Sequence, residues 1–269
     1  MAGEILKRRT ALLLALTLAS LFAPALLRAQ VAVPGLSPAP TQENRGGYQI
    51  PATAKAAAPE DLTGYWVSLV TEDWRYRMLT PPKGDYESVP LSPEGKKLAD
   101  SWDPAKDEAD GNQCKSYGAA AIMRVPGRLH ITWENDTTLR IDADAGIQTR
   151  LLHFGGQPPS SGQPQWQGYS SADWQIIGDG RAPPRGGYLK VETSHLRPGY
   201  LRKNGVPYGS KTVLTEYFTS VKESNGDSYL IVTSVVNDPQ YLNAPFTTST
   251  HFKKQPDAAG WRPTPCKAR

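Results

Sequence analysis

A strict alternation of apolar and polar residues runs through the middle of this chain and constrains its fold more than any other feature. Residues 129–134 read LHITWE, so an apolar side chain falls on every second residue, the period of a β-strand with one buried face. Turn-forming residues follow at Asn135-Asp136, and the alternation resumes at 139–141 and, after a turn at 144–146, at 150–154. Sequential strands joined by such short turns must run antiparallel. The sequence therefore predicts a three-stranded antiparallel meander.

More strand candidates follow the meander and are punctuated by Gly and Pro. Asn225-Gly226 between two of them is a strong hairpin signal. The Pro-, Gly- and Ser-rich stretch 157–165 is expected to be a loop. Many short strands with such punctuation favour an all-β fold, an antiparallel barrel or sandwich. The later candidates are residues 188–195, 212–221, 228–236 and 246–253.

One short helix is expected near residues 93–102, outside the barrel. Ser92 is a favourable N-cap residue, and Pro93 suits the first helical position because its missing N–H would have no partner there. Asp103-Pro104 predicts the end of the helix, since the residue before a proline avoids the helical conformation.

The N-terminus has the charge, apolar and small-residue order of an export signal. A basic group at residues 7–9 precedes an apolar run from 11 to 27, and small residues follow, so we expect a signal peptide over 1–29. An uncleaved membrane anchor is the alternative. The Pro- and Ala-rich stretch 30–60 predicts a linker, residues 61–255 the barrel, and 256–269 an irregular C-terminal tail. The signal predicts a periplasmic or secreted protein.

The net charge excludes one class of partner. The whole chain has 30 basic and 26 acidic residues, but residues 1–29 hold four of the basic and one of the acidic residues. The exported chain would keep 26 basic and 25 acidic residues, a net charge of +1. No basic field remains to collect a polyanion, so we expect neither a nucleic-acid partner nor a membrane contact beyond the export signal.

The two cysteines predict one disulfide. Cys114 and Cys266 both lie in the exported part, where an oxidising compartment favours their pairing. The bond would tie the C-terminal tail back to the barrel. The alternatives are two free thiols or a metal pair, although the sequence has no CxxC spacing and no nearby pair of histidines to support a metal.

The start of the first strand resembles a family signature. Gly64-Tyr65-Trp66 is similar to the Gly-x-Trp motif of lipocalins, in which the Trp plugs one end of the barrel. A wider part of the chain resembles a group of secreted bacterial lipocalin-like proteins for which no catalytic residues are established. The resemblance implies export and a lipocalin-like barrel, and it carries over no catalytic residue. Its segments are EDWRYRM at 72–78, GRLHITW at 127–133, LTEY at 214–217 and DPQY at 238–241.

The segment 72–78 is the densest candidate for ligand binding. Read as a strand, it would place Arg75 and Arg77 on one face, where two guanidinium groups can hold a carboxylate or phosphate, and Trp74 and Tyr76 on the other. The alternative is a solvated strand face on which Asp73 pairs with one of the two arginines.

Histidine provides the candidates for proton transfer. His195 is expected on the inward face of its strand, where Glu216 would be its partner and Tyr217 a second acid or base. His130 and His153 are candidate ligand contacts on strands that flank 139–142. A core histidine that is satisfied by the backbone, and a zinc site built from several histidines, are the alternatives for these residues.

The remaining motifs specify no reaction. The sequence lacks a Gly-x-Ser-x-Gly elbow and a phosphate-binding glycine loop, and we predict neither a cofactor nor a metal. Seven Trp and twelve Tyr, Trp133 among them, favour a cavity for a small, partly apolar or aromatic ligand, with a core built from aromatics as the alternative. A ligand-binding barrel is the leading hypothesis. One alternative is a cofactor-independent lyase, isomerase or hydratase, with Arg75 or Arg77 holding an anionic substrate. The other is a structural or assembly factor of the cell envelope.

Overall fold

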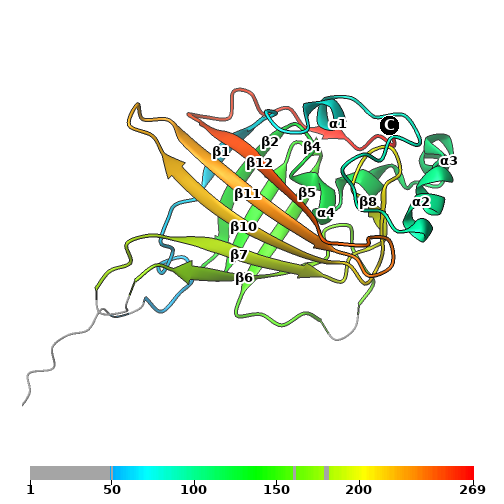
Figure 1. Cartoon of the computed structure of the whole chain (residues 1–269). Helices are drawn as coiled ribbons and strands as arrows, with labels where there is room; N and C mark the ends of the chain where they lie inside the picture. The colour runs from blue at the N-terminus through cyan, green and yellow to red at the C-terminus, as the bar shows by residue number, and fades with distance from the viewer. Residues whose placement is uncertain (1–48, 50, 160–161, 179–181) are drawn as a thin grey trace, which may run out of the picture. The chain divides into compact units, whose positions relative to one another are not determined.

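The computed structural model describes residues 49, 51–159, 162–178 and 182–269 (Figure 1). The predicted signal peptide and residues 30–48 of the predicted linker lie outside these ranges. The helices are α1 (Trp74–Met78), α2 (Pro93–Asp100), α3 (Pro104–Ala109), the 3₁₀ helix η1 (Gln113–Tyr117) and α4 (Ala119–Ile122). The barrel strands are β1 (Gly64–Leu69), β2 (Arg128–Asn135), β3 (Thr138–Ala143), β5 (Gln148–Phe154), β6 (Tyr169–Ile176), β7 (Gly187–Ser194), β10 (Val213–Lys222), β11 (Ser228–Asn237) and β12 (Phe246–Gln255).

These nine strands close into a barrel in the order β1-β12-β11-β10-β7-β6-β5-β3-β2. The predicted all-β barrel is therefore confirmed, as is the meander, because β2, β3 and β5 pair antiparallel in sequence order. Four short strands lie outside the barrel: β4 (Ala145–Gly146) pairs with β13 (Thr264–Pro265), and β8 (Gly199–Tyr200) pairs with β9 (Pro207–Tyr208).

One strand pair departs from the antiparallel prediction. β5 and β6 run parallel, with Leu152 opposite Ser170 and Phe154 opposite Ala172. Parallel neighbours need a connection that returns to the starting end of the barrel. The chain makes this return between Phe154 and Tyr169. The described residues 157–159 and 162–164 of the predicted loop belong to no helix or strand. The sequence prediction also missed β6 itself.

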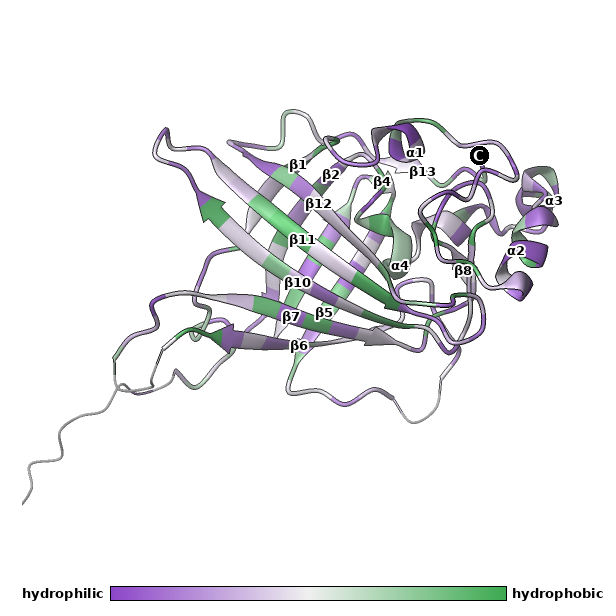
Figure 2. Ribbon diagram, in the orientation of Figure 1, coloured by the Kyte–Doolittle hydropathy of each residue, from purple (hydrophilic) through white to green (hydrophobic). Residues whose placement is uncertain are grey.

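The barrel interior is packed with the apolar residues of the alternating strands. Figure 2 shows hydrophobic and hydrophilic residues alternating along β7, β10 and β11. Trp66, Ile131, Phe218 and Phe252 are almost completely buried, and burying a side chain of this size stabilises a fold by about 1.5–3 kcal/mol. All four residues of α4 are buried, and this short helix closes one end of the barrel (Figure 1). We call this the helical end.

The prediction of one helix at this end missed α1, α3, η1 and α4. The cap of α2 is confirmed, because the Ser92 Oγ accepts a hydrogen bond from the Gly95 N–H at 3.0 Å. The predicted helix ends early, at Asp100, and the Asp103 side chain caps a second helix, α3. The segment 72–78 is not a strand but contains the short helix α1. After the chain leaves β1, Asp73 adopts a left-handed conformation (φ 48°) that turns the chain into this helix.

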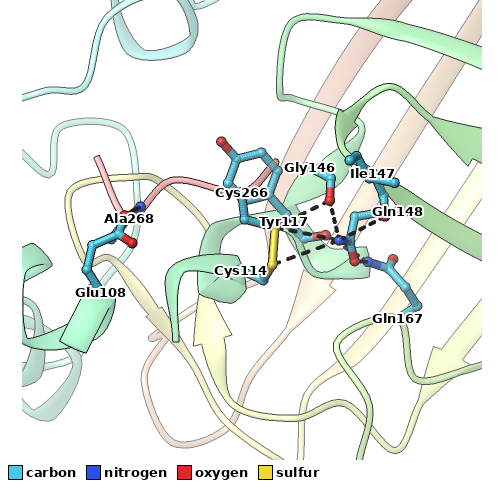
Figure 3. The surroundings of a disulfide bond; sticks show 9 residues. All are labelled: Glu108, Cys114, Tyr117, Gly146, Ile147, Gln148, Gln167, Cys266 and Ala268. Atoms are coloured by element: carbon cyan, nitrogen blue, oxygen red, sulfur yellow. Dashed lines mark hydrogen bonds between the residues drawn. A yellow bond between two sulfur atoms is a disulfide. The ribbon is translucent and has the colours of Figure 1, made fainter. Parts of the chain in front are cut away.

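The predicted disulfide between Cys114 and Cys266 is present, which rules out free thiols and a cysteine metal pair (Figure 3). It joins η1 to the C-terminal tail, and the Gln148 side-chain amide lies beside both sulfur atoms. The tail is held further by β13 and by the Ala268 N–H, which donates to Glu108 Oε1 at 2.7 Å.

The opposite end of the barrel is crossed by residues 51–60, which we call the strap. The Lys55 N–H donates to the carbonyl of Asp136, in the turn between β2 and β3. Glu60 Oε2 accepts hydrogen bonds from the Ser220 N–H (2.7 Å) and Ser220 Oγ (2.5 Å) on β10. The described part of the expected linker therefore contacts the barrel. We call this the strap end.

Candidate functional site

A cavity of about 500 Å³ lies at the strap end, between the strap and the ends of β5 and β6. This volume falls within the range of about 300–1,000 Å³ that is usual for small-molecule sites. The strap contributes small residues, and the barrel contributes aromatic and aliphatic ones. The residues that define its chemistry are Pro51, Ala52, Ala54, Phe154, Ala172, Trp174 and Ile176.

Three aromatic rings form a continuous row along the barrel side of this cavity. The rings of Phe154 and Trp174 lie 5.5 Å apart between centroids and line the cavity. Trp133 packs behind Phe154 at 5.6 Å, one ring away from the cavity. The geometry suits aromatic contacts, for which offset and tilted pairs at 4.5–7 Å are favourable. Trp133 thus supports the cavity wall from behind. Trp174, which contacts the cavity directly, was not among the residues predicted to bind a ligand.

The strap is attached to the barrel wall by the same tryptophan. Trp174 Nε1 donates a hydrogen bond to the carbonyl of Ala54 at 2.8 Å. The indole N–H thereby has a partner, and its apolar ring face remains available to the cavity. Pro59 packs close to Gly187 at the start of β7, where a side chain would clash with the proline ring. The cavity wall is therefore built from two segments far apart in the sequence.

The lining of the cavity carries little charge. Among the described lining residues, Asp173 is the single ionisable one, and its Oδ2 accepts a hydrogen bond from Gln175 Nε2 at 2.5 Å. General acid–base chemistry needs a titratable group within hydrogen-bond reach of the substrate, commonly as one of a pair. The arrangement therefore favours binding of an apolar molecule over proton transfer.

The structure does not bring the predicted catalytic residues together. β7 ends at Ser194, and His195 takes a left-handed conformation (φ 56°) that exposes its ring and directs Leu196 into the core. The expectation that His195 faces the barrel interior is therefore wrong. Its Nδ1 lies 2.9 Å from Ser194 Oγ. Tyr217 lies on the outer face of β10, edge-on to Tyr188 at 6.0 Å.

Glu216 does point into the barrel, but its partner is an arginine. Its two carboxylate oxygens accept hydrogen bonds from Arg150 Nη2 (2.6 Å) and Nη1 (3.2 Å), and both side chains are buried. Thr193 Oγ1 accepts a further bond from Arg150, and it lies 2.8 Å from Ser170 Oγ. This polar cluster inside the core was not predicted, although the alternation places residue 150 on the same face as Leu152.

The residues of 72–78 lie at the helical end, away from the cavity. Arg75 is exposed and pairs with Asp85 at 2.6 Å, and Trp74 is 62% exposed. The hydroxyl of Tyr76 donates to the Glu87 carboxylate at 2.8 Å. Arg77 is buried instead. The helical rather than strand geometry separates Arg75 from Arg77, so the expected paired guanidinium site is not formed.

Arg77 makes three contacts that connect α1 to β1, to the segment before α1 and to the residues after α4. It forms an ion pair with Glu72, donates to Ser68 Oγ at 2.9 Å, and donates to the carbonyl of Arg124 at 3.0 Å. Asp73 pairs with Arg124 at 3.0 Å, and not with a neighbouring arginine of its own segment as the alternative had it.

His130 and His153 lie on the outer face of the barrel and apart from each other. His130 stacks on Tyr65 with ring centroids 4.0 Å apart. His153 stacks on Tyr169 at 4.8 Å, and its partial burial lowers the pKa of its imidazole below the ordinary value of 6.5. In the described ranges, no three His, Cys, Asp or Glu side chains gather as a metal site would require.

The fold and the cavity define a closed nine-stranded β-barrel with an apolar site at one end. Comparison of the chain with protein-family models, with curated proteins and with solved structures finds no match. Within the part of the chain that the structure describes, none of the helices is long and apolar enough to cross a membrane. The disulfide is typical of proteins in oxidising compartments.

Proposed function

We propose that the strap-end cavity binds a small, neutral, largely apolar or aromatic molecule, and that the chain is an exported lipocalin-like binding protein of the periplasm or the extracellular space. The observation that carries this proposal is the cavity of about 500 Å³ with the rings of Phe154 and Trp174 in its wall. Buried apolar side chains such as Trp66, Ile131 and Phe218 pack in the barrel interior.

The charge of the lining selects the kind of ligand. Asp173 is the single ionisable side chain among the described lining residues, and the lining carries no described cation to pair with an acid. An anionic ligand would lose its hydration without a compensating charge, which is costly. A planar, uncharged molecule would instead bury apolar area against Phe154 and Trp174 and hydrogen-bond to backbone groups of the strap.

Export is supported by two independent features. The first is the order of basic, apolar and small residues at 1–29. The second is the disulfide between Cys114 and Cys266, a bond that persists in oxidising environments. The Gly-x-Trp resemblance at Gly64-Tyr65-Trp66 agrees with a lipocalin-like carrier, and Trp66 is buried in the barrel and donates to the Leu62 carbonyl at 3.0 Å.

A titration with N-phenyl-1-naphthylamine, a neutral aromatic fluorophore that brightens on leaving water, tests the proposal. We expect saturable binding at one site. Ile176 lines the cavity and its neighbour Ile177 does not, although both are partly exposed apolar residues at the end of β6. Ile176→Ala removes apolar contact and should weaken binding by roughly 3- to 10-fold, or about 1 kcal/mol.

The matched variant Ile177→Ala should bind the fluorophore as the unmodified protein does. Equal effects of the two substitutions, or no saturable binding by the unmodified protein, would show that the fluorophore does not occupy this cavity.

A further inference from the structure

Three buried arginines surround a second, much smaller cavity at the helical end. Arg77 comes from α1, Arg124 follows α4, and Arg202 lies between β8 and β9; their exposed fractions are 7%, 7% and 4%. All three side chains line a cavity of about 30 Å³, together with Lys203 and Tyr76. Arginine is rarely buried without a partner. Counting the carboxylates that pair with these three guanidinium groups therefore indicates the charge of a molecule that the cavity can hold.

Two of the three guanidinium groups have a carboxylate partner. Arg77 pairs with Glu72, and Arg124 pairs with Asp73. Arg202 has none within the described residues: it donates to the carbonyl of Glu87 at 2.8 Å and to Ser88 Oγ at 3.0 Å, both of which are neutral groups.

The carboxylates nearest in sequence to these acceptors are already engaged. Asp85 pairs with Arg75, and the Glu87 carboxylate accepts from the hydroxyl of Tyr76. The ring of Tyr76 lies 4.1 Å from the Arg202 guanidinium carbon, a cation–π contact that offsets part of its lost hydration. Burial and the nearby Arg124 lower the pKa of Arg202 to about 10, so it remains charged at neutral pH. The cluster therefore holds one buried positive charge more than its direct ion pairs neutralise.

Two buried N–H donors in the cluster also have no acceptor among the described residues. They are Arg124 Nη1 and Arg202 Nε. A buried donor without an acceptor is destabilising, and more so when the group is charged. Both residues line the same small cavity, so an acceptor bound there would lie beside both guanidinium groups.

We propose that this cavity is a binding site for one small oxyanion group, a phosphate, sulfate or carboxylate, held by Arg124 and Arg202. Its volume corresponds to about two or three water positions, which fits one such group and excludes a larger polyanion inside it. Guanidinium groups bind these anions through paired N–H donors. The site lies at the opposite end of the barrel from the apolar cavity and does not depend on the function proposed for it.

Calorimetric titration of the intact, oxidised chain with inorganic phosphate, sulfate and acetate, at constant ionic strength, tests the site. We expect saturable binding of at least one of these anions with one site per chain, and a thermal midpoint that rises with the logarithm of its concentration. The anion that binds most tightly distinguishes a tetrahedral from a planar oxyanion.

Arg202→Met removes the uncompensated charge and should weaken that binding by about tenfold or more. Arg262→Met, at an exposed arginine of the C-terminal tail that does not line this cavity, should leave it unchanged. Arg124→Lys keeps the charge but loses the planar donor fork, so it should also weaken binding and serves as the second variant if Arg202→Met does not fold. No saturable binding of any of the three anions, or equal losses in Arg262→Met and Arg202→Met, would overturn the proposal, because the cavity would then hold only water.

Discussion

Glu216→Ala is expected to lower the free energy of unfolding by about 3–5 kcal/mol, as breaking a buried ion pair usually does. The Glu216 carboxylate is completely buried, and Arg150 donates to both of its oxygens. The substitution would leave the Arg150 guanidinium charged inside the barrel, with Thr193 as its remaining described acceptor. Urea denaturation followed by tryptophan fluorescence measures the loss.

The matched control removes both charges. Arg150→Met combined with Glu216→Leu should recover most of the lost stability, because replacing both members of a buried pair by apolar residues of similar size is often neutral or stabilising. A loss below about 1 kcal/mol for Glu216→Ala alone would contradict a paired, buried glutamate. It would reopen the hypothesis that Glu216 is free for proton transfer.

Removal of the disulfide is the second substitution with a large expected effect. Cys114 and Cys266 are 152 residues apart in sequence. The chain-entropy model gives up to about 5 kcal/mol for closing a loop of this length in the unfolded chain. Cys114→Ala combined with Cys266→Ala should therefore lower the urea midpoint strongly and leave no reactive thiol.

The loss should also be visible locally. Hydrogen exchange should speed up first in η1 and β13, the two segments that the bond joins. The oxidised unmodified protein is the reference, and its reduced form should match the double variant. An unchanged midpoint in the double variant would mean that β13 and the Ala268–Glu108 hydrogen bond suffice to hold the tail.

The alternation of the strands predicted the barrel because it reports directly which side chains face the core. Leu129 and Ile131 are buried as their period requires, and the Ser92 cap of α2 depends only on local residues. The disulfide followed from a single possible pairing. These features depend on short-range patterns or on counting, which a sequence carries without knowledge of the fold.

The candidate site could not be predicted in the same way. The strap has no hydrophobic period, and its Ala54 acquires a role only when Trp174 reaches it from β6. β6 itself reads YSSADWQI, and its first two inward positions, Ser170 and Ala172, are small, so the segment showed no run of alternating apolar residues. The prediction that His195 faces inward was wrong because His195 itself adopts a left-handed conformation after the end of β7. This conformation reverses the face that the strand period assigns to it.

Binding of N-phenyl-1-naphthylamine by Ala172→Phe tests the proposed apolar site most directly. Ala172 is 7% exposed and lines the cavity, so a phenylalanine ring there would occupy the space between β6 and the strap. Ala56→Phe, at an exposed strap residue outside the lining, makes the same chemical change as a control. We predict that Ala172→Phe, while folded by circular dichroism, binds the fluorophore at least about tenfold more weakly than the unmodified protein, whereas Ala56→Phe binds it equally well. Undiminished binding by a folded Ala172→Phe would contradict a ligand site in this cavity.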